Sequence, residues 1–204
     1  MRRAIRVVLL MGLLGGVLLL STGCLFNIFQ TARMLGAGNT ALTIGTGLMD
    51  IDVDGGDPNW NLAPQARFAV GLSDTANLGF QTGALVPLST GEFNWLGIKG
   101  DVTFAVVDDP ETFSLALGLG AGYGIEFLNV GIFGEVLFSV NSTLPLFIVY
   151  QPTVPLNGNG FTLLHHVAGG LALPLSEKAT ILLVVDWRNG LLSPSYGIGI
   201  EIGF

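Results

Sequence analysis

Residues Ser193–Phe204 read SPSYGIGIEIGF, and along this stretch large apolar side chains alternate with glycine and glutamate. Successive side chains of a β-strand point to opposite faces, so a strand here has one bulky apolar face and one nearly bare face. The bulky face consists of Tyr196, Ile198, Ile200, Ile202 and Phe204. A soluble sandwich would bury this face, whereas a barrel in a bilayer would turn it outward to the acyl chains. The surroundings of the strand therefore decide its orientation.

The same period-two pattern recurs along the chain between clusters of turn residues. In Phe113–Ile125 the even positions are serine, alanine and four glycines, and each glycine would cost a helix roughly 1 kcal/mol relative to alanine. We predict ten strands, most of them near the roughly ten residues that a tilted transmembrane strand needs: Thr40–Leu48, Gln65–Leu72, Asn77–Val86, Trp95–Val106, Phe113–Ile125, Leu128–Val140, Leu144–Gln151, Phe161–Leu173, Ala179–Trp187 and Tyr196–Phe204. Eight strands remain the alternative, because Pro145 and Pro152 bracket the seventh segment and proline cannot donate to a ladder.

The composition indicates that much of the surface does not face water. Charged residues make up 11% of the chain, against about 25% in an average soluble domain, and apolar residues make up 50%. A lipid bilayer is the partner that this balance favours. The net charge of −7 excludes nucleic acid as an expected partner, since binding to phosphates needs a basic surface. Cys24 is the only cysteine, so the chain forms no internal disulfide and no thiolate metal site.

The first 24 residues indicate export. Three arginines at positions 2, 3 and 6 precede the uncharged apolar run Val7–Leu20, and small residues follow it, which is typical of a secretory signal peptide over residues 1–23. The stretch STGC at 21–24 resembles the lipobox of bacterial lipoproteins, and the resemblance implies lipidation of Cys24. It departs from that pattern at Ser21, where the family usually has leucine. An ordinary cleaved signal and an uncleaved anchor helix are the alternatives. We expect residues 24–38 to form a periplasmic segment and residues 39–204 to form the barrel.

Export, period-two strands and a final strand that ends at Phe204 together resemble the small bacterial outer-membrane β-barrels. The resemblance implies an all-β fold, a closed antiparallel up-and-down transmembrane barrel, located in the bacterial outer membrane. It also implies that Phe204 belongs to the signal recognised by the outer-membrane barrel-assembly machinery. A helical membrane protein and a soluble all-β binding lipoprotein are the rival interpretations. The first is disfavoured by the charges and prolines that interrupt the apolar runs.

Strand parity places a set of charged side chains inside such a barrel: Arg67, Lys99, Asp101, Glu135, Asp186 and Glu201. Charges in a narrow lumen are costly unless they are paired, so Arg67 and Lys99 should each find a carboxylate. The hypotheses are a structural ion-pair network and a ring that lines a thin, cation-preferring pore. Parity also sends apolar side chains inward: Leu85, Phe133, Leu137, Leu164, Leu182 and Val184. These leave a packed interior or a conduit for small apolar ligands as further alternatives.

Other residue patterns give weaker indications of a site. Asp50, Asp52 and Asp54 have the spacing of a calcium loop, but Asn61 stands where that loop has its bidentate glutamate. We therefore expect no metal and no cofactor. The two histidines, His165 and His166, are adjacent and have no nucleophile motif beside them, so we do not expect an enzyme. The sequence favours a structural envelope component or a narrow passive pore.

Overall fold

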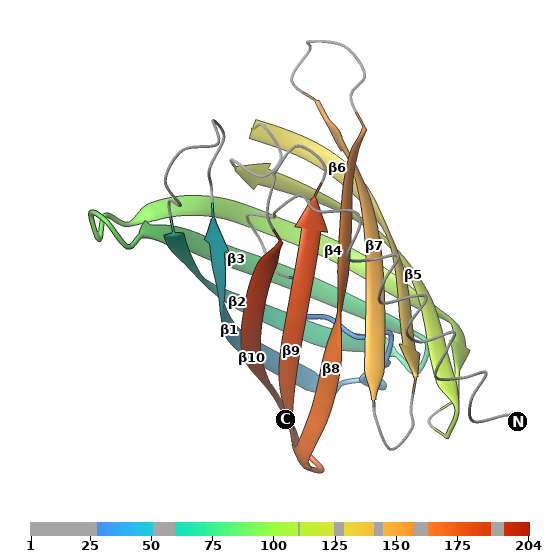
Figure 1. Cartoon of the computed structure of the whole chain (residues 1–204). Helices are drawn as coiled ribbons and strands as arrows, with labels where there is room; N and C mark the ends of the chain where they lie inside the picture. Colours follow the sequence, from blue (N-terminus) through green and yellow to red (C-terminus); the bar gives the residue numbers. More distant parts are fainter. Residues whose placement is uncertain are drawn as a thin grey trace, which may run out of the picture.

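The computed structural model describes residues 28–50, 60–109, 111–124, 129–140, 145–156, 163–188 and 194–204. Within these ranges the chain forms ten antiparallel strands in a single sheet that closes into a barrel (Figure 1). The strands are β1 (Thr40–Asp50), β2 (Trp60–Ser73), β3 (Ala76–Pro87), β4 (Asn94–Asp108), β5 (Phe113–Gly124), β6 (Asn129–Val140), β7 (Leu146–Pro155), β8 (Leu164–Ser176), β9 (Ala179–Arg188) and β10 (Ser195–Gly203). No helix in the described part of the chain is long and apolar enough to cross a bilayer.

Each strand pairs with its neighbours in sequence, and the pairing of β1 with β10 closes the wall. This last seam runs from Ala41 opposite Gly203 to Leu48 opposite Tyr196. The predicted ten-stranded up-and-down barrel is confirmed, and the eight-stranded and helical alternatives are wrong. We call the end at which β1 begins and β10 finishes the termini end of the barrel. It also carries the tight turn Glu177–Lys178 between β8 and β9.

Large apolar side chains cover the outside of the wall. On β5, Leu117 is exposed and Leu119 is 71% exposed, while Gly118 between them is buried. On β10, the exposed side chains are Tyr196, Ile198, Ile200 and Ile202. Soluble monomers rarely expose contiguous apolar surface of this kind. Hydrocarbon tolerates it, because a closed ladder leaves no unpaired sheet edge. The barrel is therefore of the transmembrane class, and the strand at the C-terminus turns its bulky face outward.

The seventh strand continues through a proline. The predicted segment ended at Gln151, but β7 extends to Pro155. The pairing of β6 with β7 passes from Phe133 opposite Thr153 to Val136 opposite Tyr150, so Pro152 falls in a two-residue interruption of that ladder. On its other side Pro152 is in register with His165 of β8. Proline lacks the amide hydrogen of a ladder, and here it breaks one seam locally without ending the strand.

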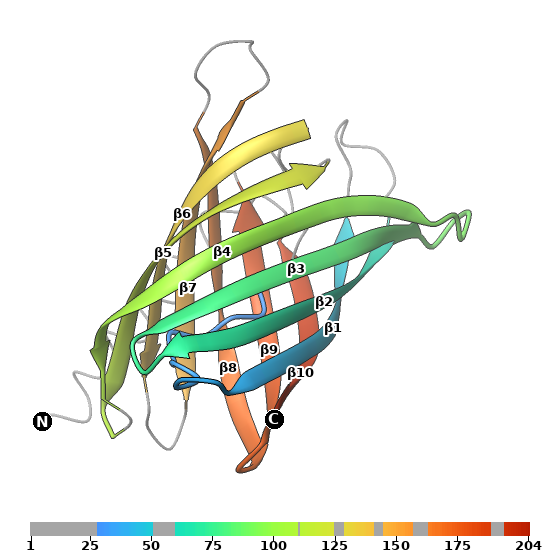
Figure 2. The same cartoon turned by 180° about the vertical axis from the view of Figure 1, so that it is seen from behind.

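Residues 28–38 lie inside the barrel. We expected residues 24–38 to form an N-terminal periplasmic segment and residues 39–204 to form the barrel. The described part of that range, which we call the inner segment (residues 28–38), instead has Ile28, Phe29, Ala32 and Met34 buried among lumen side chains. Figure 2 shows its trace, at the blue end of the colour scale, enclosed by the strands before it joins β1. The lumen is therefore occupied by the chain's own N-terminal part.

Candidate functional site: an occupied lumen

A buried ion pair joins two strands across a third. Arg67 on β2 donates to both carboxylate oxygens of Asp101 on β4, at 2.6 and 2.9 Å. Its side chain has to pass over β3, where Gly79 is in register with Asp101. A methyl group at Gly79 would overlap the guanidinium, so this glycine provides the space for the arginine. Both side chains are buried, and the pairing expected for Arg67 is present.

Lys99 finds a different partner from the one expected. Its ammonium donates to the amide oxygen Oε1 of Gln151 on β7 at 2.9 Å, and it lies 5.4 Å from the centroid of the Phe133 ring. Gln151 in turn donates to the Thr153 hydroxyl at 3.3 Å. No ion pair between Lys99 and a carboxylate is formed by the residues that the structure describes. Gln151 was not identified as a lumen residue from the sequence, because the predicted strand ended at that residue.

Glu135 on β6 is buried in the lumen beside the inner segment. Its side chain is 2% exposed, and neither carboxylate oxygen accepts a hydrogen bond from the described residues. The charged groups that act on it are Lys99, Asp101 and Arg67, and the Gln30 side chain of the inner segment lies beside it. The amide oxygen of Gln30 is likewise buried without a partner. These three oxygen atoms are therefore buried in the middle of the lumen, close to one another and to Lys99 and Arg67.

Asp186 and Glu201 lie toward opposite ends of the lumen. Asp186, two residues before the end of β9, accepts a hydrogen bond from the Ile28 main-chain N at 3.2 Å. It also lies 3.4 Å from Nε2 of the buried His166. Glu201, near the termini end of β10, accepts a hydrogen bond from the Thr43 hydroxyl at 3.4 Å. The six charged positions thus all lie on the lumen side, but along its length rather than in one ring.

Polar side chains of the wall hold the inner segment mainly by its main chain. The Ala32 N donates to the Ser139 hydroxyl at 2.9 Å. Asn77 accepts a hydrogen bond from the Leu35 N at 3.2 Å and donates to the Arg33 carbonyl at 3.3 Å. The segment therefore runs from the level of Asp186 down to the termini end, where it turns into β1.

Apolar contacts also hold the inner segment. Phe29 is 2% exposed, and its ring lies against the bare backbone of Gly45 on β1 and Gly199 on β10. A methyl group built on Gly45 would lie 2.7 Å from this ring, and one on Gly199 would lie 3.0 Å from it. We call this recess the glycine slot (Gly45 and Gly199). It explains why β10 has glycine at an inward position: the missing side chain makes room for an aromatic ring.

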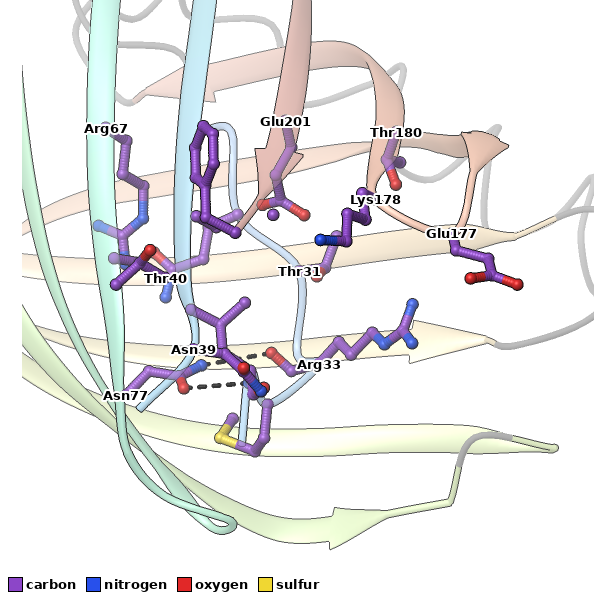
Figure 3. A pocket seen from close by; sticks show the side chains of 17 residues that line it. Thr31, Arg33, Asn39, Thr40, Arg67, Asn77, Glu177, Lys178, Thr180 and Glu201 are labelled. Carbon is purple, nitrogen blue, oxygen red and sulfur yellow. Dashed lines mark hydrogen bonds between the residues drawn. The ribbon is translucent and has the colours of Figure 1, made fainter. Parts of the chain in front are cut away.

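Two cavities flank the inner segment at the termini end. Their volumes are about 330 Å³ and about 760 Å³. Both are lined by Thr31, Arg33, Met34, Thr180 and Glu201, so the segment divides this mouth of the barrel. Figure 3 shows Arg33, Lys178, Glu177 and Glu201 around the smaller cavity, with hydrogen bonds of Asn77 drawn beside it. The mouth is therefore charged and partly open, while the middle of the lumen is filled.

The remaining candidate positions include Phe204, which belongs to the rim of the smaller cavity. Phe204 is exposed, and its main chain pairs with Thr40 through hydrogen bonds of 2.8 and 3.3 Å. Asp50 ends β1, whereas Asp52, Asp54 and Cys24 fall outside the described residues. In the part of the chain that the structure describes, no three His, Cys, Asp or Glu side chains gather as metal ligands. The Tyr150 hydroxyl lies 2.7 Å from Nδ1 of His165.

Comparison with known proteins finds similar architecture at low sequence identity. No family model and no curated protein matches the chain. A designed transmembrane β-barrel is 13% identical, covers 84% of this chain and 100% of its own, and has a TM-score of 0.39. The N-terminal β-barrel domain of Pseudomonas aeruginosa OprF is 11% identical over 83% of this chain and 99% of its own, with a TM-score of 0.39. The Escherichia coli outer-membrane protease OmpT is 9% identical over 82% and 97%, with a TM-score of 0.47. At these sequence identities and TM-scores, the role of a residue in those proteins is not transferred to any residue of this chain.

Proposed function

We propose that this chain is a bacterial outer-membrane β-barrel that forms a narrow passive pore, kept closed by its inner segment. The observation that carries the proposal is a closed wall with an apolar exterior around a charged interior that residues 28–38 occupy. A structural interior needs no buried charge, and desolvating a charge is costly. Side chains that line a water-filled pathway avoid this cost whenever the pathway is open. The proposal includes no catalytic step and no cofactor.

A structural envelope component is the second candidate, and the filled lumen supports it. Conductance through a planar bilayer separates the two candidates. The Ala32 N lies 2.9 Å from the Ser139 hydroxyl, so these two residues are adjacent. In a Cys24→Ser background, the double substitution Ala32→Cys, Ser139→Cys therefore introduces two neighbouring thiols that can be oxidised to a disulfide between the inner segment and the wall. The reduced protein should open intermittently like the parent, and the oxidised protein should be silent. Equal conductance before and after oxidation would show that the inner segment does not close the conduction pathway. Silence of both the parent and the reduced variant would support the structural role.

Ion selectivity tests whether the wall charges line the pathway. Four acidic side chains (Asp101, Glu135, Asp186 and Glu201) and two basic ones (Arg67 and Lys99) are the predicted lumen charges, so open channels should prefer cations. Removing a cation with Lys99→Met should raise the permeability ratio of K⁺ to Cl⁻ roughly twofold or more, since the local potential becomes more negative. Reversal potentials in a salt gradient measure this ratio. Lys99→Arg keeps the charge and should leave the ratio near the parent value; identical ratios in all three proteins would contradict the pathway.

The proposal also includes lipidation of Cys24 and recognition of the terminal Phe204 by the barrel-assembly machinery. Lipidation rests on the similarity of STGC to a lipobox, and recognition rests on an aromatic residue that remains exposed at the end of β10. Metabolic labelling with a fatty acid should mark the parent, and Cys24→Ala should lose the label. A Cys24→Ala protein that keeps its full label would show that the lipid is attached elsewhere.

A further inference from the structure

We infer that the lumen is a binding channel for a peptide, which the inner segment fills within the same chain. The ligand class is a short peptide in the conformation of the inner segment, which is neither helix nor strand and bends at Ala32, with an aromatic residue at one position and a small residue three positions later. Phe29 and Ala32 supply this pattern in the chain itself. The inference needs the closed barrel and its inner segment, and it does not depend on conductance.

The first argument is that the wall recognises main-chain atoms. Asp186, Ser139 and Asn77 accept hydrogen bonds from the main-chain N of Ile28, Ala32 and Leu35. Asn77 also donates to the carbonyl of Arg33, so one carboxamide binds both a donor and an acceptor of the segment. Main-chain contacts of this kind give affinity for a peptide backbone whatever its side chains, as in other peptide-binding grooves. A foreign peptide in the same conformation offers the same groups.

The second argument is that one side chain has a fitted recess. The Phe29 ring occupies the glycine slot, where it contacts positions on both strands of the β1–β10 seam. Ala32 is fully buried in the same cluster as Leu137, Phe147 and Leu182 of the wall. A larger residue at position 32 would have to displace these side chains, because interiors are close-packed. The slot and the small site together give the channel its preference for aromatic and small residues.

The third argument is that the inner segment is joined to the barrel through a glycine hinge. Gly36 and Gly38 have φ values of +79° and +78°, in the left-handed region that favours glycine. The chain reverses there before β1 begins at Thr40. Side chains of the segment pack on the lumen, and its main chain enters no strand ladder of the wall. The turn itself is anchored to β2, because the Gly38 N donates to the Gly71 carbonyl at 2.9 Å. Release of residues 28–35, with this turn kept in place, therefore leaves the barrel's strand pairing intact and exposes the channel.

The test uses a capped, fluorescent synthetic peptide of residues 28–38 and measures its anisotropy with folded barrels in detergent. Phe29→Ala in the full chain weakens the internal occupant and should give saturable peptide binding. The parent should bind at least tenfold more weakly, because its own segment competes at a high effective concentration. A peptide with alanine in place of its phenylalanine should bind the Phe29→Ala barrel at least tenfold more weakly. Slower migration after boiling confirms that each barrel is folded.

Two further variants keep the inference falsifiable. Adding Gly199→Val to Phe29→Ala fills the slot and should abolish saturable binding, and the oxidised Ala32→Cys, Ser139→Cys barrel should bind no peptide. The inference fails if the folded Phe29→Ala barrel binds no peptide. It also fails if the oxidised Ala32→Cys, Ser139→Cys barrel binds the peptide as well as the Phe29→Ala barrel does. That result would place the peptide on the outer surface or in the detergent. None of these results depends on whether the barrel conducts, so failure of the pore proposal remains distinguishable.

Discussion

Arg67→Met should lower the free energy of unfolding of the barrel by about 3–5 kcal/mol, the cost of leaving a buried charge without its partner. Arg67 makes two short hydrogen bonds to Asp101, and both groups are buried. The same guanidinium also acts electrostatically on Glu135 and Glu201, so its removal takes a neighbouring positive charge from three carboxylates. Urea titration of the folded barrel in detergent, followed by tryptophan fluorescence, measures the change.

The double variant Arg67→Met, Asp101→Leu is the matched control for this loss. Replacing both partners of a buried ion pair by apolar groups is often neutral or stabilising. The double variant should therefore recover most of the stability that Arg67→Met loses. If Arg67→Met unfolds at the same urea concentration as the parent, the ion pair is open to water and the interior is not packed as described.

Leu119→Arg should destabilise the membrane-inserted barrel by roughly 2–4 kcal/mol, the cost of a cationic side chain at the bilayer midplane. Leu119 lies in the middle of β5, points outward and is 71% exposed. Unfolding from lipid vesicles measures the effect. Leu88→Arg is the control, because Leu88 is also exposed but lies beyond the end of β3, where the cost falls to about 0–1 kcal/mol. Equal, small losses at both positions would mean that water, and not lipid, surrounds the wall.

The wall of the barrel was predictable from sequence because one rule governs nearly all of it. Each strand alternates a lipid-facing side chain with a lumen-facing one, and the parity of a single residue such as Ile200 assigns the rest of its strand. The rule fails locally where a ladder is irregular, as at the register shift between Ala105 and Val107 of β4 and at Pro152 of β7. Pro152 was taken as a boundary, although it occupies a gap in one ladder while β7 continues.

The contents of the lumen were less predictable, because strand parity tells which side of the wall a side chain points to but not which residue it contacts. Lys99 points inward as expected, but its partner Gln151 lies three strands away across the barrel, on β7. The inner segment has no period-two pattern, so nothing in its local sequence distinguishes it from a linker. Its position depends on recesses that form only when β1 and β10 meet. Sequence periodicity does not reveal a recess that forms only when the first and last strands pair.

The pairing of β1 with β10 has a consequence for how the protein is made. This seam joins the two strands farthest apart in sequence, and bringing distant strands together carries the largest loop-closure entropy. The first of those strands follows directly after residues 28–38, and its Gly45 contacts the Phe29 ring together with Gly199 of the last strand. Closure of the cylinder during biogenesis therefore also completes the recess that holds the Phe29 ring, so this ring can reach its final contacts only once the first and last strands have met.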